Sequence, residues 1–361
     1  MSQDHHVSLL ANVPALTIGV DLGDRTSRTC ELDAAGRCVR ETTVATSEAA
    51  MRRYFAARPR SRVVFETCTH SPWLARLVRG LGHEVVVANP SAMFTRGARR
   101  RRNDALDARF LARQGRADVA LLHPITHRSL DAQHALAQLR ARDQLVKVRT
   151  QLINHVRGAV KAVGQRLSAA SAESFARRAR AELPAALAAA LGPLVEVIAT
   201  LTERIRAADR ALARLIVERY PVAQCLQQPA GVGPVTALAY VLLIVDDPHR
   251  FRRSRDAGPY FGLVPRLDES STATPQLRIS KAGDGLGRRL LVSAAQYILG
   301  PFGPACDLRR HGQAIAQRGG KNAKKRAVVA VARKLAVLLH HLWVTGATYD
   351  PDYLLHRTRS A

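Results

Sequence analysis

The 361-residue sequence has few cysteines, no zinc-binding histidine motif and no long apolar run. Its five cysteines form no CxxC pair and no metal-ligand spacing with histidine, so we expect reduced, mostly buried thiols: Cys30, Cys38, Cys68, Cys225 and Cys306. The 13 histidines form neither HxH nor HExxH. No stretch of 18 apolar residues and no basic-then-apolar leader occurs, which predicts a soluble, cytoplasmic chain without a membrane segment.

Acidic residues are also scarce, because 29 of them stand against 55 lysines and arginines for a formal net charge of +26. This excess predicts a polyanionic partner, with nucleic acid as the first choice. Only seven of the 55 are lysine, so a solvated basic surface from an arginine-favouring genome is an alternative. Arginine also forks onto phosphate and stacks on bases, which suits nucleic acid. No amphipathic helix with bulky apolar anchors accompanies the basic clusters, so a membrane surface is not expected.

Residues 15–125 alternate strand-like and helix-like segments, which predicts a mixed α/β domain. Strands are predicted at 15–21, 27–33, 37–44, 62–66 and 84–88, and helices at about 47–58, 71–80 and 104–114. The turn Ala34-Ala35-Gly36 joins the second and third strands, so a three-stranded meander opens the domain. This order of elements is that of a ribonuclease H-like sheet.

Residues 126–220 contain almost no strand signal and predict long helices. One apolar stripe recurs at steps of 3 and 4 in Leu145, Val148, Leu152, Val156, Ala159, Val163 and Leu167. A stricter stripe comprises Leu187, Leu191, Leu194, Ile198, Leu201, Ile205, Ala208, Leu212 and Leu215. Its alternating steps of 4 and 3 predict a coiled-coil seam. We favour a coil between subunits, and a helical hairpin within one chain is the alternative.

A mostly helical third domain is predicted at 221–346, followed by a C-terminal tail at 347–361. Gly231 and Gly233 stand between two helical segments, as in a helix-hairpin-helix, where glycines let backbone N–H groups approach a phosphate. A plain turn between two helices fits the same residues.

Four carboxylates fall at element ends that converge in the predicted sheet. Asp21 ends the first strand and Glu66 ends the fourth, its expected neighbour. Asp104 and Asp107 lie three residues apart on one face of the following helix. Such a set in a basic chain predicts bound Mg²⁺ or Mn²⁺, since oxygen ligands without histidine or thiolate suit hard cations. Taken singly, each residue could merely cap a helix or end a strand.

The C-terminal domain carries a polar loop after the apolar turn at 261–265, and basic clusters lie outside the apolar stripes. We expect nucleic acid to contact Arg99, Arg100, Arg101, Arg102, Arg266, Arg278, Lys281, Arg288, Arg289, Lys321, Lys324 and Lys325, together with Gly231 and Gly233. By composition alone, a hydroxyl in the polar loop is an ordinary turn residue.

The order of the short motifs GVD, FET, NDALDAR, PAGVGPVTA, FGLVPRLDES, RISKAGD and GGKNAKKRAVVAVARKLAVLL resembles one family over residues 15–345. These are the insertion-sequence transposases that pair an N-terminal RuvC-like DEDD domain with a C-terminal serine domain. They include the Piv-type DNA invertases and the insertion-sequence 110 type, which are bridge-RNA-guided recombinases.

The resemblance implies a role for each matching residue. The four acidic ligands of the family match Asp21, Glu66, Asp104 and Asp107, and its nucleophilic serine matches Ser270. It implies a transposase or site-specific recombinase that cuts DNA through a phosphoserine link. Carboxylates and metal would come from one subunit and serine from another, within a homo-oligomeric dimer or tetramer guided by a structured RNA.

The sequence departs from the family pattern at three places. Ala230 precedes Gly231 where the family usually has proline, and Asn103 stands before the acidic pair in place of lysine. Ser271 replaces a glycine, which leaves Ser270 and Ser271 open as the attacking hydroxyl.

Two other functions fit parts of the sequence. A hydrolytic nuclease of the Holliday-junction-resolving type would use the carboxylates and metal to activate water, without Ser270. A non-catalytic RNA- or DNA-binding scaffold would use the charge alone and would leave the acidic set unexplained.

Overall fold

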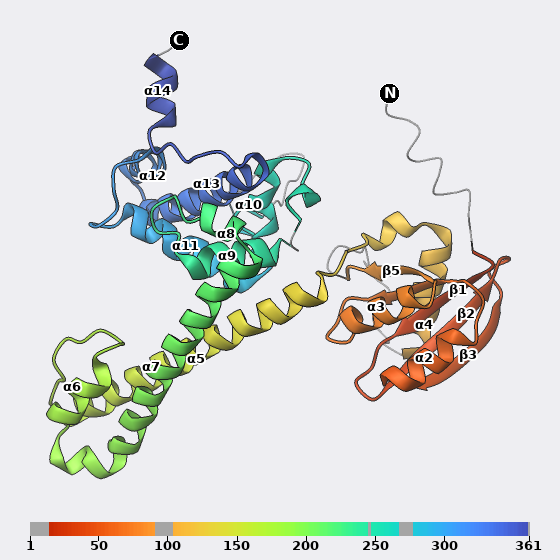
Figure 1. Cartoon of the computed structure of the whole chain (residues 1–361), viewed down its shortest axis with the longest axis horizontal. Helices are drawn as coiled ribbons and strands as arrows, with labels where there is room; N and C mark the ends of the chain where they lie inside the picture. The colour runs from red at the N-terminus through yellow and green to blue at the C-terminus, as the bar shows by residue number, and fades with distance from the viewer. Residues whose placement is uncertain (1–13, 91–103, 245–246, 267–276, 360–361) are drawn as a thin grey trace. The chain divides into compact units, whose positions relative to one another are not determined.

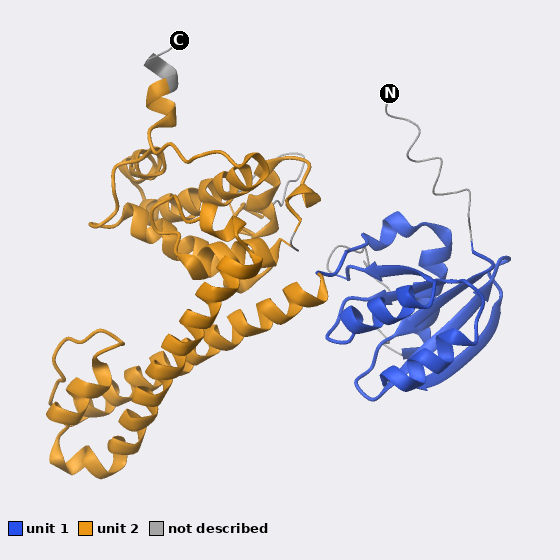
Figure 2. Cartoon of the chain, viewed as in Figure 1, with its two compact units in different colours: residues 1–128 blue, residues 129–361 orange. Residues whose placement is uncertain are grey.

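The computed structural model describes residues 14–90, 104–244, 247–266 and 277–359. The chain divides into two compact units, residues 1–128 and 129–361 (Figure 2). The boundary between the two units follows residue 128, and the first domain was predicted to end at residue 125. Apart from residues 126–128, the predicted helical region, C-terminal domain and tail all belong to the second unit.

The first unit is built on a five-stranded sheet. Its strands are β1 (Leu16–Asp21), β2 (Thr26–Asp33), β3 (Cys38–Ala45), β4 (Arg62–Glu66) and β5 (Glu84–Ala88). They are ordered β3-β2-β1-β4-β5, with β1–β2 and β2–β3 antiparallel and β1–β4 and β4–β5 parallel (Figure 1). The predicted mixed sheet is confirmed, in the strand order expected of a ribonuclease H-like domain.

Helices cover both faces of this sheet: α2 (Glu48–Ala56), α3 (Ser71–Gly80) and α4 (Asp104–Ala117), followed by the short turn η1 (Val119–Leu122). Successive strand residues point to opposite faces. Ile18 and Val20 of β1 therefore pack with α2 and α3. Val64 of β4 packs on the other face with Leu111 of α4. Because β1 and β4 are buried on both faces, their sequences are nearly continuous apolar runs.

The second unit is helical. It contains α5 (Leu130–Ala162), α6 (Phe175–Glu182), α7 (Ala185–Arg219), α8 (Val222–Cys225), α9 (Pro234–Leu243), η2 (Pro248–Arg250), η3 (Ser254–Asp256), α10 (Ala257–Tyr260), α11 (Gly285–Leu299), α12 (Asp307–Gln317), α13 (Ala323–Thr345) and α14 (Tyr353–Arg359). Helix α9 lies at the centre, since all its residues from Ala237 to Leu243 are buried. The same core takes in Leu136 of α5, Leu212 of α7 and Leu335 of α13. This shared core joins the helical region to the C-terminal domain.

Helices α5 and α7 pack against each other along much of their length and form the long arm in Figure 1. The buried positions of α7 are Leu191, Val195, Ile198, Thr202, Ile205, Leu212 and Ile216. The 4,3 spacing is therefore real, but alternate members are one residue later than predicted: Val195 and Thr202 are buried where Leu194 and Leu201 are half-buried. The seam faces α5 of the same chain, so the hairpin alternative describes this packing. Contact between subunits stays a prediction.

The stripe predicted for α5 is displaced in the same way. Ile153, Val156 and Val160 are buried in the arm, whereas Val163 is 50% exposed. Arg149 is also buried there and donates to Glu173 of the segment before α6 and to Thr202 of α7. Polar contacts therefore fix the pairing of the two helices in addition to apolar packing.

Two helices, α7 and α13, are long and apolar enough to cross a membrane by length and composition alone. Both carry apolar side chains that pack within the second unit, α7 against α5 and α13 in the core around α9. Their apolar composition thus has a packing role within the chain.

The hairpin arm predicts a contrast between neighbouring positions on α7. Ile198 is fully buried in the seam, so Ile198→Ala should lower the free energy of unfolding by about 2–4 kcal/mol. Val197 is 46% exposed, so Val197→Ala should cost less than about 1 kcal/mol. Denaturant unfolding of the two variants measures the difference. Equal losses at both positions would contradict the seam.

Candidate active site and basic groove

Asp21 and Glu66 lie at adjacent ends of two parallel strands. Val20 of β1 is paired with Phe65 of β4, so the two acids follow at the same level of the sheet. Both lie on the face that α4 covers, because Gly19 and Val64, two residues before them, contact that helix. Asp21 and Glu66 are each half-buried. The adjacent ends of β1 and β4 thus place Asp21 and Glu66 side by side in the backbone register, and their role as metal ligands stays a prediction.

A glycine allows α4 to bring the other two acids to this edge. A Cβ at Gly19 would lie 2.0 Å from the carbonyl oxygen of Ala108 and 2.5 Å from the amide nitrogen of Ala112. Near the other end of α4, a Cβ at Gly115 would lie 2.3 Å from Cγ2 of Val64. The helix therefore lies directly on the strands, with Asp104 and Asp107 exposed in its first turn.

The charges of the four carboxylates act on one another. Burial, and after it the negative charges of Asp104, Asp107 and Glu66, raise the pKa of Asp21 from its ordinary 3.8 to about 6. The oxygens are not drawn into one tight cluster: among the described residues, three ligand atoms within 4.8 Å of one another occur at a different place, described below. Like charges that act on one another in an all-oxygen donor set fit a hard divalent cation.

The polar loop that carries Ser270 lies outside the described residues, as do Arg99, Arg100, Arg101 and Arg102. The structure does describe both ends of that loop. Pro265 and Ile279 form an antiparallel bridge, and the amide of Arg266 donates to the carbonyl of Arg278. Arg266 and Arg278 are both exposed. The bridge therefore holds the two arginines together at the base of the loop.

Three of the residues expected to contact nucleic acid have partners inside the protein. Arg288 donates to the carbonyls of Phe261 and Ala282, and Arg289 pairs with Asp143 of α5 at 2.5 Å. A Cβ at Gly231 would lie 2.8 Å from the carbonyl oxygen of Ala294, so this glycine allows its turn to pack on α11. These contacts give the three residues structural roles, and their contact with nucleic acid stays a prediction.

Other predicted basic residues line one large groove of about 1780 Å³ on the second unit. Its walls come from residues 277–281, α12, α13 and the tail at 347–354. Eight basic side chains line it: Arg278, Lys281, Arg318, Lys321, Lys325, Arg326, Arg333 and Lys334. We call this surface the α13 groove. Lys324, on the same helix, is exposed but does not line it.

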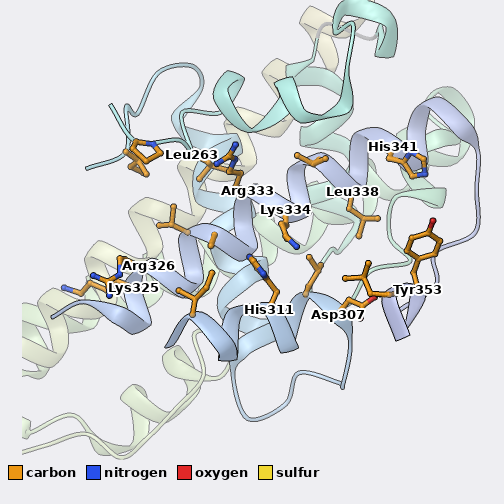
Figure 3. Close-up of a pocket in the computed structure, with 18 of the residues that line it drawn as sticks. Leu263, Asp307, His311, Lys325, Arg326, Arg333, Lys334, Leu338, His341 and Tyr353 are labelled. Atoms are coloured by element: carbon orange, nitrogen blue, oxygen red, sulfur yellow. The ribbon is translucent and has the colours of Figure 1, made fainter. Parts of the chain in front are cut away.

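The α13 groove has a basic half and an apolar half, which follow from the order of residues along α13. Lys325 and Arg326 lie near the start of the helix, whereas Leu338 and His341 lie near its end, beside Tyr353 of the tail (Figure 3). A volume of this size exceeds the roughly 300–1,000 Å³ of a small-molecule pocket. The groove therefore fits part of a polymer better than a small ligand.

Among the residues that the structure describes, the basic residues of the groove have no acidic partners. None of the eight forms an ion pair with another residue that the structure describes. The two acids in the lining are already paired, Asp307 with Arg310 and Asp350 with His356. The positive charge acts on His311 of α12: burial, and after it the charges of Lys334 and Arg318, lower the pKa of this histidine. An anionic ligand would relieve this repulsion.

Sequence reasoning missed several of these residues. His311, Arg333 and Lys334 were not singled out, because they line the groove through the packing of α12 on α13. It also missed that Cys30 and Cys38 face each other at 3.7 Å between sulfur atoms. A search for CxxC could not find them, but their positions on the two strands that flank the turn at 34–36 could have suggested their closeness. The expectation of mostly buried thiols is wrong for Cys38, which is exposed like Cys68 and Cys225.

The chain matches known proteins over most of its length. Residues 18–164 match a DEDD-type family described as Transposase, and residues 223–305 match a family described as Transposase IS116/IS110/IS902 family. The sequence is 30% identical over 343 residues to the transposase for insertion sequence element IS1111A of Coxiella burnetii, covering 92% of this chain and 90% of that protein. It is 29% identical over 313 residues to a probable family 20 transposase of Pseudomonas aeruginosa, covering 84% and 90%. Similarity to the transposase for insertion sequence element IS1328 of Yersinia enterocolitica is 28% over 294 residues, covering 78% and 83%.

The raised pKa of Asp21 predicts a stability change at this site. Because its pKa is about 6 in the folded protein and 3.8 for an ordinary aspartate, the charged carboxylate destabilises the metal-free protein above pH 6, and the penalty disappears as pH falls toward 4. With solvent screening, Asp21→Asn should raise the unfolding free energy by about 1 kcal/mol at pH 7.5 in EDTA.

The control is Asp24→Asn, since the Asp24 side chain is 93% exposed. Thermal denaturation at pH 7.5 and pH 4.0 measures both variants. A lower melting temperature for Asp21→Asn at pH 7.5, or a gain that persists unchanged at pH 4.0, would contradict the repulsion among the carboxylates.

Proposed function

Because the chain belongs to the IS116/IS110/IS902 family of transposases, we propose that it cuts and rejoins DNA strands through a phosphoserine intermediate. The observation that carries this proposal is the convergence of four acids, in which Asp104, Asp107 and Glu66 all raise the pKa of Asp21. Such a site suits metal-assisted chemistry on phosphodiesters. We propose that the enzyme acts in the cytoplasm.

Asp21, Glu66, Asp104 and Asp107 would hold Mg²⁺ or Mn²⁺. When bound, the ions would supply Lewis-acid stabilisation of the charge that develops on the phosphoryl oxygens. Gly19 positions the acids for this role, because it lets α4 lie on β1. The half-buried Asp21 would gain most from a cation, since both burial and three like charges oppose its ionisation.

Ser270 is the proposed nucleophile. Its Oγ forms a bond to phosphorus while one P–O bond of the DNA strand breaks, and the hydroxyl proton passes to a base or to the departing strand oxygen. The hydroxyl of another strand then attacks the phosphoserine, the Ser270 Oγ–P bond breaks and the serine is restored. The number of P–O bonds is unchanged throughout, so joining needs no other energy source. Arg266 and Arg278, held at the base of the loop, would steady the phosphate.

The α13 groove is the proposed path of the nucleic-acid strand in the second unit. Its eight basic side chains have no acidic partner among the described residues, and Arg278 belongs both to the groove and to the base of the serine loop. The partners we propose are DNA ends and target, a structured guide RNA, and further copies of the chain in a dimer or tetramer.

Ser270→Ala should abolish covalent protein–DNA adducts, because the nucleophile is lost, while nucleic-acid binding persists. Ser271→Ala is the matched control and should retain adducts. Denaturing electrophoresis of the protein after reaction with labelled DNA in Mg²⁺ measures them. An Asp21→Asn, Asp104→Asn double variant should cut nothing.

Each other outcome has a defined meaning. An adduct in Ser270→Ala that disappears in Ser271→Ala would move the nucleophile to Ser271. Mg²⁺-dependent cutting by Ser270→Ala at the wild-type rate, without adducts in either protein, would replace the phosphoserine mechanism with the hydrolytic nuclease.

The α13 groove predicts that charge reversal inside the groove weakens DNA binding more than the same charge reversal outside it. Lys325→Glu with Lys334→Glu removes two phosphate contacts, so affinity for a DNA oligonucleotide should fall about 10-fold or more. The slope of log affinity against log salt should weaken by about 1.5–2. Arg210→Glu with Arg214→Glu makes the same change in net charge on the exposed side of α7 and should act far less. Fluorescence anisotropy in EDTA measures both, and equal losses would show that only net charge matters.

A further inference from the structure

A second group of metal-binding side chains lies in the first unit, separate from the four acids. Cys30 of β2 and Cys38 of β3 are 3.7 Å apart at their sulfur atoms. One carboxylate oxygen of Glu41, also on β3, completes a set whose ligand atoms all lie within 4.8 Å of one another. The pairing of β2 with β3 explains this closeness, because Cys30 lies opposite Glu41 and a register shift after Glu31 brings Cys38 opposite Leu32.

We propose that Cys30, Cys38 and Glu41 form a site for a thiophilic divalent cation, with Zn²⁺ as the natural ion. Thiolates bind Zn²⁺ at about 2.3 Å in a tetrahedron, which places two sulfur ligands about 3.8 Å apart. The observed 3.7 Å matches this separation without movement of the strands. The fourth position would be taken by water, since Cys38 is exposed and the site is open on that side.

Arg109 of α4 holds one of the proposed ligands in place, as residues hydrogen-bonded to metal ligands usually do. Its Nε and Nη2 atoms both donate to Oε1 of Glu41, at 2.9 and 2.7 Å. The two bonds fix the orientation of the carboxylate and leave Oε2 for a metal, as hydrogen bonds to ligand carboxylates do elsewhere. The charges also balance, because two thiolates and one carboxylate carry −3 and the ion with Arg109 carries +3.

The metal-free Cys30 thiol is not activated by its surroundings. Burial, followed by the contact with Cys38, raises the pKa of Cys30 to about 12. The Cys30 thiol therefore stays protonated at neutral pH, and cation binding would release its proton.

A bound ion would strengthen the contact between edge strand β3 and α4, the helix that carries the proposed catalytic acids Asp104 and Asp107. Strand β3 is at the edge of the sheet. Cys30 packs with Ala108 and Ala112 of α4, and Arg109 is two residues after Asp107. The metal would act on stability and on the placement of α4, without touching the reacting phosphate.

The test uses the full chain, reduced and freed of metal, titrated with Co²⁺. One equivalent should produce a thiolate-to-cobalt charge-transfer absorption in the near ultraviolet and intense visible bands typical of tetrahedral Co²⁺. Zn²⁺ should displace it, Mg²⁺ should not, and saturating Zn²⁺ should raise the melting temperature by several degrees. The Asp21→Asn, Asp104→Asn variant should keep the signal, which separates this site from the DEDD acids and from the proposed function.

Variants assign the ligands. Cys38→Ser should abolish the absorption and the thermal shift, and because Cys38 is exposed the fold should survive, as circular dichroism checks. Glu41→Gln should weaken Co²⁺ binding about 10-fold or more and keep the sulfur band. Cys225→Ser, at another exposed thiol, is the matched control and should change nothing.

The proposal is overturned by absence of the charge-transfer band in reduced wild-type protein. It is also overturned if the band survives Cys38→Ser, or if Cys225→Ser removes it. Formation of a Cys30–Cys38 disulfide under mild oxidation, with no Co²⁺ bound by the reduced protein, would assign the pair to redox chemistry instead.

Discussion

Helix α4 can lie on strand β1 only because Gly19 has no side chain, and the candidate active site depends on that contact. Any Cβ at this position would overlap the backbone of Ala108 and Ala112. Without the contact, the two acids in the first turn of α4 could not raise the pKa of Asp21. The same approach brings Arg109 to Glu41 of β3. The absence of a side chain at Gly19 thus positions the acids of α4 beside Asp21 and brings Arg109 to the proposed thiol-containing site.

Each unit contains one group of like charges, negative in the first unit and positive in the second. In the first, negative side chains converge on Asp21 inside a chain of net charge +26. In the second, the α13 groove gathers positive side chains that have no acidic partner among the described residues. Elsewhere in the second unit arginines do find such partners, as Arg142 with Asp209 and Arg180 with Glu196. Repulsion within each group raises the free energy of the protein without a ligand, and a ligand of opposite charge would lower it.

The sheet and its acids could be predicted from sequence because both are set by local patterns. Strand ends follow from apolar runs and turns, and the ribonuclease H-like order then places Asp21 beside Glu66. The predicted coiled-coil seam was wrong by one residue at two positions. The buried residues are Val195 and Thr202, where the prediction had Leu194 and Leu201. Helix α7 has apolar residues on both sides of its seam, so spacing alone allows either register. The buried hydroxyl of Thr202 accepts a hydrogen bond from Arg149 of α5, a contact that no single-helix pattern contains.

The α13 groove could not be predicted, since it joins segments as distant as Leu263 and Leu354. Its charge is nevertheless compatible with a stable fold, because α13 divides its roles between two faces. One face, with Val331, Leu335 and Leu339, is buried in the core around α9, where Tyr240 donates to the carbonyl of Ala336. That burial supplies the stability of the helix. The other face can therefore hold like charges together without unfolding the helix.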